Sequence, residues 1–319
     1  MQFDVGAELA ERYGLDAAGC AGEPFGPRPW HRATYYVGAP GPEQPSTIAS
    51  VRIRGWHNLG NLVQQLLHAL AFAEQNDLEV VSGPATPWFR SGTVAGTRLT
   101  IGGRFPRPAL VGHYFYPQPL GVAEPWRRTH HLRGLRDLFA VAPDPTVAPD
   151  EMVVHLRSGD VFGADPHPDY WPPHLGYYTS AVAHAVEHGA AASVRLVCQD
   201  RVHPLLEPLR SWCSDRGLGA TVQVSDDLHA DVATLVAGRT LCVSQGTLGL
   251  SSAWLSPAVR TVYLPPGAHV RDLLDLGVQV LEADLPSTGE PWRASPGQVA
   301  GLGRETGPVP LRDLSSPQE

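Results

Sequence analysis

The chain has 319 residues, of which 43% are hydrophobic, and its formal net charge at pH 7 is -8. This length suits two domains of ordinary size, and the negative charge argues against a general nucleic-acid-binding surface. All 24 basic residues are Arg, so the sequence excludes a Schiff-base lysine and a Walker-type phosphate lysine. Any side-chain cation that holds an anion must therefore be Arg or protonated His.

The N-terminal stretch of 20 residues carries charges early and lacks the apolar stretch of a signal peptide. No apolar run approaches the ~20 residues that a membrane-spanning helix needs. The cysteines have no CxxC spacing, and they stand at Cys20, Cys198, Cys213 and Cys242. We therefore expect a cytoplasmic protein without a membrane span, whose thiols are reduced core residues.

The first half of the chain contains one clear βαβ pattern. After an irregular, Pro-rich and Gly-rich segment over 1–45, the sequence predicts a strand at 47–55, a helix at 58–77 and a strand at 78–83. The turn between the first strand and the helix contains Gly60. A further helix is expected around 130–139.

The second half alternates strands with helices. Strands are expected at 151–157, 193–199, 220–225, 240–245 and 260–265, and helices at 174–189, 202–217, 228–238 and 247–256. This alternation predicts a parallel sheet with helices on both faces, in which ligands bind outside the carboxyl ends of the strands. Polar side chains stand at those ends: His155, Arg157, Gln199, Asp200, Ser244 and Gln245.

One strand ends in the segment VHLRSGD, which contains His155, Arg157 and Asp160. This segment resembles the HxRxGD-type motif of the GDP-fucose-dependent fucosyltransferases, the superfamily of α1,2-, α1,6- and protein O-fucosyltransferases. Two further segments resemble that superfamily in the expected order: the Gly-containing turn and helix start at 58–65, and the helix, strand and Ser-rich turn at 231–254. Together the three segments cover about half of the chain.

The resemblance implies a GT-B type glycosyltransferase built from two Rossmann-like α/β domains. It implies an acceptor-side α/β domain over 1–150 and a nucleotide-sugar-binding Rossmann-like domain over 151–286, followed by an extension over 287–319. We expect the polar, Pro-rich tail to be a loose extension or a strap across the first domain. The sequence departs from the family pattern at Asn58, Ser158 and Val161, where members carry Gly, a second Arg and, in some, a catalytic Lys.

The resemblance assigns Arg157 to the diphosphate, where a guanidinium stabilises the charge that develops on departing GDP. The alternative is a structural ion pair with Asp160. His155 and Asp231 match positions that contact guanine, and a carboxylate can accept from both N–H donors of that base. The alternatives are a backbone-bonded His and an Asp that caps a helix.

A turn at 244–247 combines hydroxyl groups and backbone N–H groups where the next helix begins. Ser244, Gln245, Gly246 and Thr247 are therefore expected at the phosphates, with ordinary helix capping as the alternative. On the other domain, Asn58, Gly60 and Asn61 offer backbone and amide groups to the donor.

Asp165 lies ten residues after His155, an offset at which some family members carry their general base. The alternative is a solvated loop carboxylate, and Asp160, His167 and Asp169 compete for the same role. We expect no metal and no cofactor, because the sequence contains no HExxH motif and no Cys–His cluster.

These residues lead to a hypothesis of an inverting transfer of L-fucose from GDP-fucose to a hydroxyl. The expected partners are the nucleotide-sugar donor and a hydroxyl-bearing acceptor, such as a small molecule, a natural product or a glycan precursor. Two alternatives stay open: the same fold with a different nucleotide-sugar donor, in antibiotic or polysaccharide biosynthesis, and a non-catalytic nucleotide-sugar binder.

Overall fold

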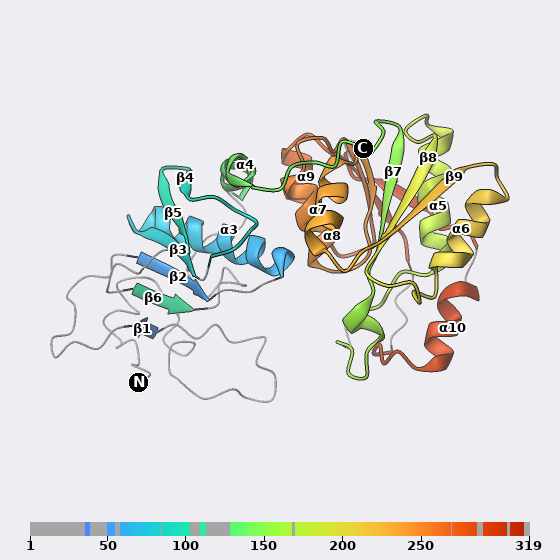
Figure 1. Cartoon of the computed structure of the whole chain (residues 1–319), viewed down its shortest axis with the longest axis horizontal. Coiled ribbons are helices and arrows are strands. Elements are labelled where there is room, and N and C mark those ends of the chain that lie inside the picture. Colours follow the sequence, from blue (N-terminus) through green and yellow to red (C-terminus); the bar gives the residue numbers. More distant parts are fainter. Residues whose placement is uncertain are drawn as a thin grey trace. The chain divides into compact units, whose positions relative to one another are not determined.

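The structure is a computed structural model, and it describes residues 36–38, 50–54, 58–83, 85–102, 109–112, 128–167, 170–268, 270–285, 290–304 and 307–315. The chain divides into two compact units, Met1–Ala140 and Val141–Glu319. Each unit is built around its own sheet, and helices alternate with strands through most of unit 2 and at β2, α3 and β3 of unit 1 (Figure 1). The expectation of two Rossmann-like α/β units is confirmed.

Unit 1 holds a six-stranded sheet in the order β1-β6-β2-β3-β5-β4. Its inner strands β6, β2, β3 and β5 are parallel, whereas β1 and β4 are antiparallel edge strands. The strands are β1 (Tyr36–Gly38), β2 (Ser50–Arg54), β3 (Glu79–Gly83), β4 (Gly92–Val94), β5 (Thr97–Ile101) and β6 (Ala109–Gly112). Among its described residues, this unit has the helices α3 (Leu59–Gln75) and α4 (Arg128–Leu138). The expected βαβ pattern is thus present as β2, α3 and β3.

Helix α3 forms because its apolar residues recur at helical spacing and are buried. Leu62, Leu66 and Leu70 have at most 1% of their surface exposed, and α3 packs on β2 and β3. The helix begins at Asn58, whose side-chain oxygen accepts a hydrogen bond of 3.0 Å from the Gly60 N–H. Such a cap stabilises a helix by about 1 kcal/mol relative to Ala.

Unit 2 holds a seven-stranded sheet in the order β13-β12-β11-β10-β7-β8-β9. All neighbouring strands are parallel except β12 and β13. The strands are β7 (Glu151–Leu156), β8 (Ser193–Cys198), β9 (Gly219–Val224), β10 (Thr240–Cys242), β11 (Thr261–Leu264), β12 (Gln279–Ala283) and β13 (Leu311–Asp313). Counted from β7, the six parallel strands have the 3-2-1-4-5-6 order of a doubly wound nucleotide-binding fold.

Helices cover both faces of this sheet, as Figure 1 shows. One face packs against α5 (Leu175–Glu187) and α6 (Leu206–Ser214), with α10 (Pro296–Arg304) against α5. The other packs against α7 (Leu228–Ala237) and α8 (Thr247–Leu255), and α9 (Arg271–Asp275) contacts α8 and β12. Because His155 is in register with Val197 and Gln223 on adjacent strands, these three side chains point to one face.

The polar tail does not remain a loose extension in its described residues. It contributes α10 and β13 to unit 2, where β13 pairs antiparallel with β12. Trp292 is buried and its indole N–H donates a hydrogen bond of 2.6 Å to the Val161 carbonyl. Trp171 donates in the same way to the Glu290 carbonyl at 2.7 Å. The tail therefore supports the loop that follows β7.

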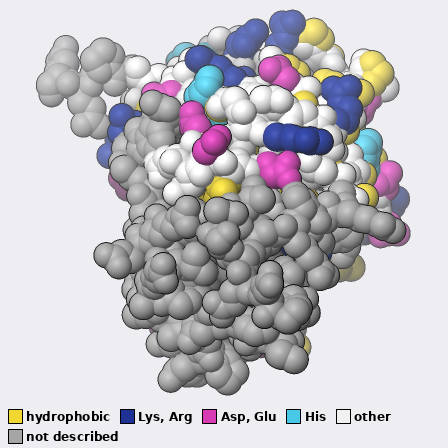
Figure 2. Space-filling view, turned by 90° about the vertical axis from the view of Figure 1, so that its left-hand side faces the viewer, with side chains coloured by type: hydrophobic (Ala, Val, Ile, Leu, Met, Phe, Trp, Pro, Cys, Tyr) yellow, Lys and Arg dark blue, Asp and Glu magenta, His cyan; other side chains and the backbone are white. Residues whose placement is uncertain are grey.

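The burial of the cysteines and the mixture of surface charges agree with the expectations of core thiols and of no general nucleic-acid-binding surface. Cys198, Cys213 and Cys242 are free and buried, and Cys20 lies outside the described residues. On the face drawn in Figure 2, the described basic and acidic side chains are interspersed and do not form a basic stripe. Among the described residues, we found no helix that combines the length and apolar character needed to cross a membrane.

Candidate functional site

The candidate site lies where the strand order of unit 2 reverses. Strands β7 and β10 are adjacent and parallel, and their following connections lead to helices on opposite faces of the sheet. In doubly wound sheets the crevice beyond this point is where ligands bind. The two chain segments meet there, because the Arg157 N–H donates a hydrogen bond of 3.2 Å to the Ser244 hydroxyl. Of the strand-end residues named from the sequence, Arg157 and Ser244 are thus in direct contact.

The Arg157 guanidinium is held from several sides. Its Nη2 lies 2.9 Å from Asp160 Oδ2 and 3.2 Å from Asp160 Oδ1, and its Nη1 donates to the Gln245 carbonyl at 3.5 Å. The Tyr170 ring lies beneath it, with 4.7 Å from Cζ to the ring centroid. The ion pair with Asp160 is thus present, and it is accessible, because the Asp160 side chain is 75% exposed.

A pocket opens beside this guanidinium. It is lined by residues from the segment after β7, from helix α5 and from the turn after β10: Arg157, Val161, Tyr170, Pro172, Tyr178, Ser244 and Gln245. The lining combines one cation with aromatic and apolar surface. An anion that displaced the exposed Asp160 carboxylate would meet the guanidinium fork directly.

Gly246 is the N-cap residue that precedes α8, and it lies against Arg157. It has φ 126° and ψ 178°, and a Cβ atom built there would lie 2.1 Å from Arg157 Nη1. The side chain of any other residue would therefore occupy the position of the guanidinium. The cation stands beside a helix N-terminus, which itself favours negative charge.

Two residues that sequence reasoning did not select brace the backbone after β7. His203 Nδ1 accepts from the Leu205 N–H at 3.1 Å, so Nε2 carries the proton and donates to the Arg157 carbonyl at 3.1 Å. Burial lowers the pKa of His203 to about 4, which keeps the ring neutral. The Ser158 hydroxyl accepts from the Gln199 N–H at 3.0 Å. In the sequence, the only indication of a role for Ser158 and His203 was that they follow β7 and β8, which are neighbouring strands.

His155 is buried in β7, with 7% of its surface exposed. Burial and the charges of Arg157 and His203 lower its pKa to about 3, so the imidazole is neutral at physiological pH. Its Nδ1 is buried and has no hydrogen-bond partner among the described residues. The alternative of a His that bonds the backbone is therefore not observed at this nitrogen.

Asp231 lies in the first turn of α7 and is 6% exposed. The capping role belongs to Asp227, whose carboxylate accepts from the His229 N–H at 2.9 Å. Asp231 Oδ1 instead accepts from the Gln223 amide at 3.0 Å. Burial, together with the charge of Asp227, raises the pKa of Asp231 to about 6 against the opposing hydrogen bond from Gln223.

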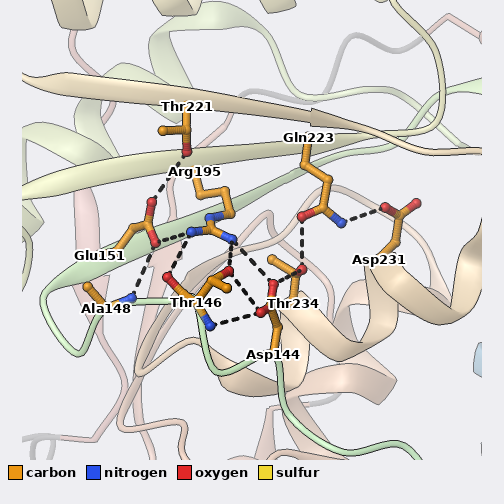
Figure 3. Close-up of polar contacts among 9 residues, drawn as sticks. All are labelled: Asp144, Thr146, Ala148, Glu151, Arg195, Thr221, Gln223, Asp231 and Thr234. Atoms are coloured by element: carbon orange, nitrogen blue, oxygen red, sulfur yellow. Dashed lines mark hydrogen bonds and ion pairs between the residues drawn. The ribbon is translucent and has the colours of Figure 1, made fainter.

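A polar network continues from Asp231 along this face of the sheet, as Figure 3 shows. The Thr234 hydroxyl lies 2.9 Å from Gln223 Oε1 and 3.2 Å from Asp144 Oδ2. Arg195 then joins Asp144, at 3.3 Å, to Glu151, at 2.9 Å. The buried carboxylate is therefore the end of a hydrogen-bonded chain and not an isolated acid.

The remaining candidates have simpler surroundings. Asp165 is exposed in the bend after the short 3-10 helix Gly159–Phe162, and Asp169 lies outside the described residues. Thr247 is the first residue of α8. Asn58, Gly60 and Asn61 all lie at the N-terminus of α3 in unit 1, where Asn58 serves as the helix cap.

A histidine pair with metal-ligand spacing escaped sequence analysis. His184 and His188 are four residues apart in the sequence, and their rings stack with centroids 3.9 Å apart. His184 Nδ1 bonds the Tyr263 hydroxyl at 2.9 Å, and His188 Nδ1 donates to the His184 carbonyl at 2.8 Å. Within the described ranges, no group of three or more His, Cys, Asp or Glu residues could hold a metal ion.

No family model matches the chain, and no curated protein matches it. Among solved structures, the chain is similar to the fucosyltransferase NodZ from Bradyrhizobium, with 12% identity, coverage of 76% of this chain and 97% of that one, and a TM-score of 0.40. It is also similar to POFUT1 in complex with GDP-fucose, with 12% identity, coverage of 68% and 98%, and a TM-score of 0.44. A third is the bacterial iron-containing dodecameric glycosyltransferase TibC from enterotoxigenic E. coli, with 15% identity, coverage of 69% and 58%, and a TM-score of 0.38. Similarity at this level does not assign a donor or an acceptor.

Proposed function

We propose that this protein is a glycosyltransferase that transfers L-fucose from GDP-fucose to an acceptor hydroxyl with inversion at the anomeric carbon. The observation that carries the proposal is the Arg157 guanidinium at the switch point of a doubly wound sheet, in contact with the Gly246 backbone at the start of α8. A fixed guanidinium beside a helix N-terminus suits a diphosphate.

In the proposed reaction, the acceptor oxygen attacks the anomeric carbon while the bond from that carbon to the β-phosphate oxygen breaks. The bonding electron pair leaves with GDP, and Arg157 stabilises the charge that develops there. The acceptor proton passes to a base, for which Asp165 is the candidate. Its exposure in the loop after β7 allows it to meet an acceptor that enters from solvent.

The base of the nucleotide is the second part of the proposal. Asp231 Oδ1 is engaged by Gln223, and the other carboxylate oxygen has no hydrogen bond to any described residue. A carboxylate can accept from both guanine N1–H and the exocyclic amine, which adenine and uracil cannot offer as a pair. The neutral His155, with Nδ1 unpaired, supplies a further ring contact on the same face of the sheet.

Hydrolysis of the donor, which is transfer to water, tests the proposal without a known acceptor. GDP release from GDP-fucose is measured for the wild type, Arg157→Ala and the control Arg210→Ala, whose surface pair with Glu207 lies on α6. NMR reads the configuration of the released sugar. We expect GDP release with inversion in the wild type and the control, and its loss in Arg157→Ala.

Other outcomes separate the alternatives. Release from a different nucleotide sugar would replace fucose as the donor. GDP binding without release from any sugar nucleotide, even with a panel of hydroxyl acceptors, would leave a non-catalytic binder. If neither GDP nor any other nucleoside diphosphate binds, the proposal fails.

A further inference from the structure

Gln223 stands between Asp231 and Thr234, and each end of its amide has one partner. Its Nε2 donates to Asp231 Oδ1 at 3.0 Å, and its Oε1 accepts from the Thr234 hydroxyl at 2.9 Å. The amide nitrogen can only donate and the amide oxygen can only accept. An ionised Asp231 therefore requires the nitrogen to face it. The single proton of the Thr234 hydroxyl then serves Gln223 Oε1, which is nearer than the other acceptor in reach, Asp144 Oδ2 at 3.2 Å.

The reverse orientation of the amide would have a defined chemical consequence. It would set Oε1 against Asp231 Oδ1, so that two acceptors would face each other unless the carboxyl group carried a proton. A protonated Asp231 donates at one oxygen and cannot accept from two neighbouring N–H groups of a purine together. The orientation of Gln223 thus decides whether Asp231 can serve as an acceptor.

We propose that Gln223 is a positioning residue that determines base specificity, because its amide, which Thr234 bonds at the other end, holds Asp231 as an oriented acceptor for the paired N–H donors of guanine. This inference rests on the proposed guanine contact of Asp231 and adds a residue that touches the carboxylate and not the nucleotide. The short Gln223–Asp231 distance, the burial of Asp231 and the second bond to Thr234 all support it.

The charged and titratable groups around Asp231 make this hydrogen bond necessary. Asp227, on the same helix, is negative and disfavours a second charge. Cys198, on β8, remains a neutral thiol because burial raises its pKa to about 11. The ion pair of Asp144 with Arg195 lies beyond Thr234. Because burial already raises the pKa of Asp231 to about 6, the Gln223 donor opposes protonation near neutral pH.

The test uses Gln223→Met, which keeps the length of the side chain and removes both hydrogen bonds. Unit 2 offers a matched control: the Thr261 hydroxyl donates to Gln279 Oε1, and Gln279 Nε2 donates to Asp313 Oδ2 at 2.8 Å. Gln279→Met therefore removes the same kind of Thr–Gln–Asp bonds, which here connect β11, β12 and β13. Calorimetry measures GDP and ADP binding by both variants and the wild type from pH 5 to 8.5.

For Gln223→Met we expect GDP binding to weaken about fivefold at pH 6 and about twofold at pH 7, because loss of the bond to a charged group leaves more of Asp231 protonated at each pH. The midpoint pH of GDP binding should rise by about one unit. At pH 8.5, affinity should return to within about threefold of the wild type, and Gln279→Met should match the wild type throughout. A structural defect alone would not be rescued by raising the pH.

Three results would overturn the inference: wild-type GDP binding by Gln223→Met at every pH, an equal loss at every pH, or the same change in Gln279→Met. If Gln223→Met does not fold, Gln223→Glu replaces it. Two adjoining carboxyl groups share a proton, so this variant should lose GDP affinity near pH 7, and retained affinity would overturn the inference. A wild type that shows no preference for GDP over ADP would instead refute the proposed guanine contact itself.

Discussion

Replacing Gly246 with Ala tests the geometry of the site without removing any charged group. The new Cβ would lie 2.1 Å from Arg157 Nη1, 3.2 Å from its Cζ and 3.3 Å from its Cδ. Ordinary carbon contacts begin near ~3.5 Å, so the guanidinium must move by more than about 1 Å. If Arg157 holds the diphosphate, this displacement should cost a charge-assisted hydrogen bond, about 1.5–3 kcal/mol, or about tenfold to a hundredfold in the Kd for GDP.

The variant should also lose stability, because φ 126° is a conformation that residues with a Cβ rarely adopt. Gly217→Ala is the control for that strain: it has φ 69° and would meet no atom within 4 Å. Calorimetry with GDP and thermal denaturation are measured for both variants. We expect both to lose stability and only Gly246→Ala to lose GDP affinity. Wild-type GDP binding by a folded Gly246→Ala would refute the proposed role of Arg157.

Four further changes have defined outcomes. Arg157→Ala should be folded by circular dichroism and should lower kcat by ~10²–10³ with a smaller effect on the donor KM. Arg157→Lys should restore little of the lost activity, because an ammonium lacks the bidentate fork. A near-wild-type kcat in Arg157→Ala would exclude stabilisation of the leaving GDP by Arg157. Asp160→Asn should tighten GDP binding by no more than about fivefold in low-salt calorimetry, because it removes an exposed carboxylate that competes with the diphosphate for Arg157. Weaker binding would mean that Asp160 orients Arg157. The pKa of Asp231 is about 6 in the folded state and 3.8 in the unfolded state, so the charged carboxylate destabilises the fold and stability falls as pH rises from about 4 to 6. Asp231→Asn should therefore raise the free energy of unfolding at pH 7.5 by about 1–3 kcal/mol in urea titrations. An unchanged value would contradict the raised pKa. Turnover should survive EDTA, because Arg157 supplies the cation; loss restored by Mg²⁺ or Mn²⁺ would show that the diphosphate needs a metal.

The parallel sheet of unit 2 could be predicted because its buried strands are continuous apolar runs that alternate with helical patterns. β7 is an example, with every residue from Glu151 to Leu156 buried. The alternation of side chains along a strand then placed His155 and Arg157 on the same side. The antiparallel strand β13 was missed, because three residues in a polar, Pro-rich tail carry no periodic signal. The strands β4 and β5 were also missed, because they have only three and five residues and are separated by a tight turn at Ala95 and Gly96.

The site depends on contacts between segments far apart in the sequence, which spacing alone does not reveal. "DDLHAD" offered several acids for one helix start, and only the structure assigns the cap to Asp227 and leaves Asp231 to Gln223. Gly246 lies against Arg157, and the Arg157 N–H donates to the Ser244 hydroxyl, which is 87 residues further along the chain. His203 escaped prediction because its role is a hydrogen bond to a backbone carbonyl, which any residue could offer.

The central claim is that unit 2 binds a guanine nucleotide through Arg157 and Asp231, and a thermal-shift panel of nucleotides tests it most directly. GDP, GDP-fucose, ADP, UDP and dTDP are each added to the wild type and to Asp231→Asn at equal concentration. A ligand at a hundred times its Kd adds about 2.7 kcal/mol of stability, which gives a clear rise in melting temperature. We predict that GDP and GDP-fucose stabilise the wild type most and that Asp231→Asn loses this preference. Equal stabilisation by all the diphosphates, or none by GDP, would contradict the account.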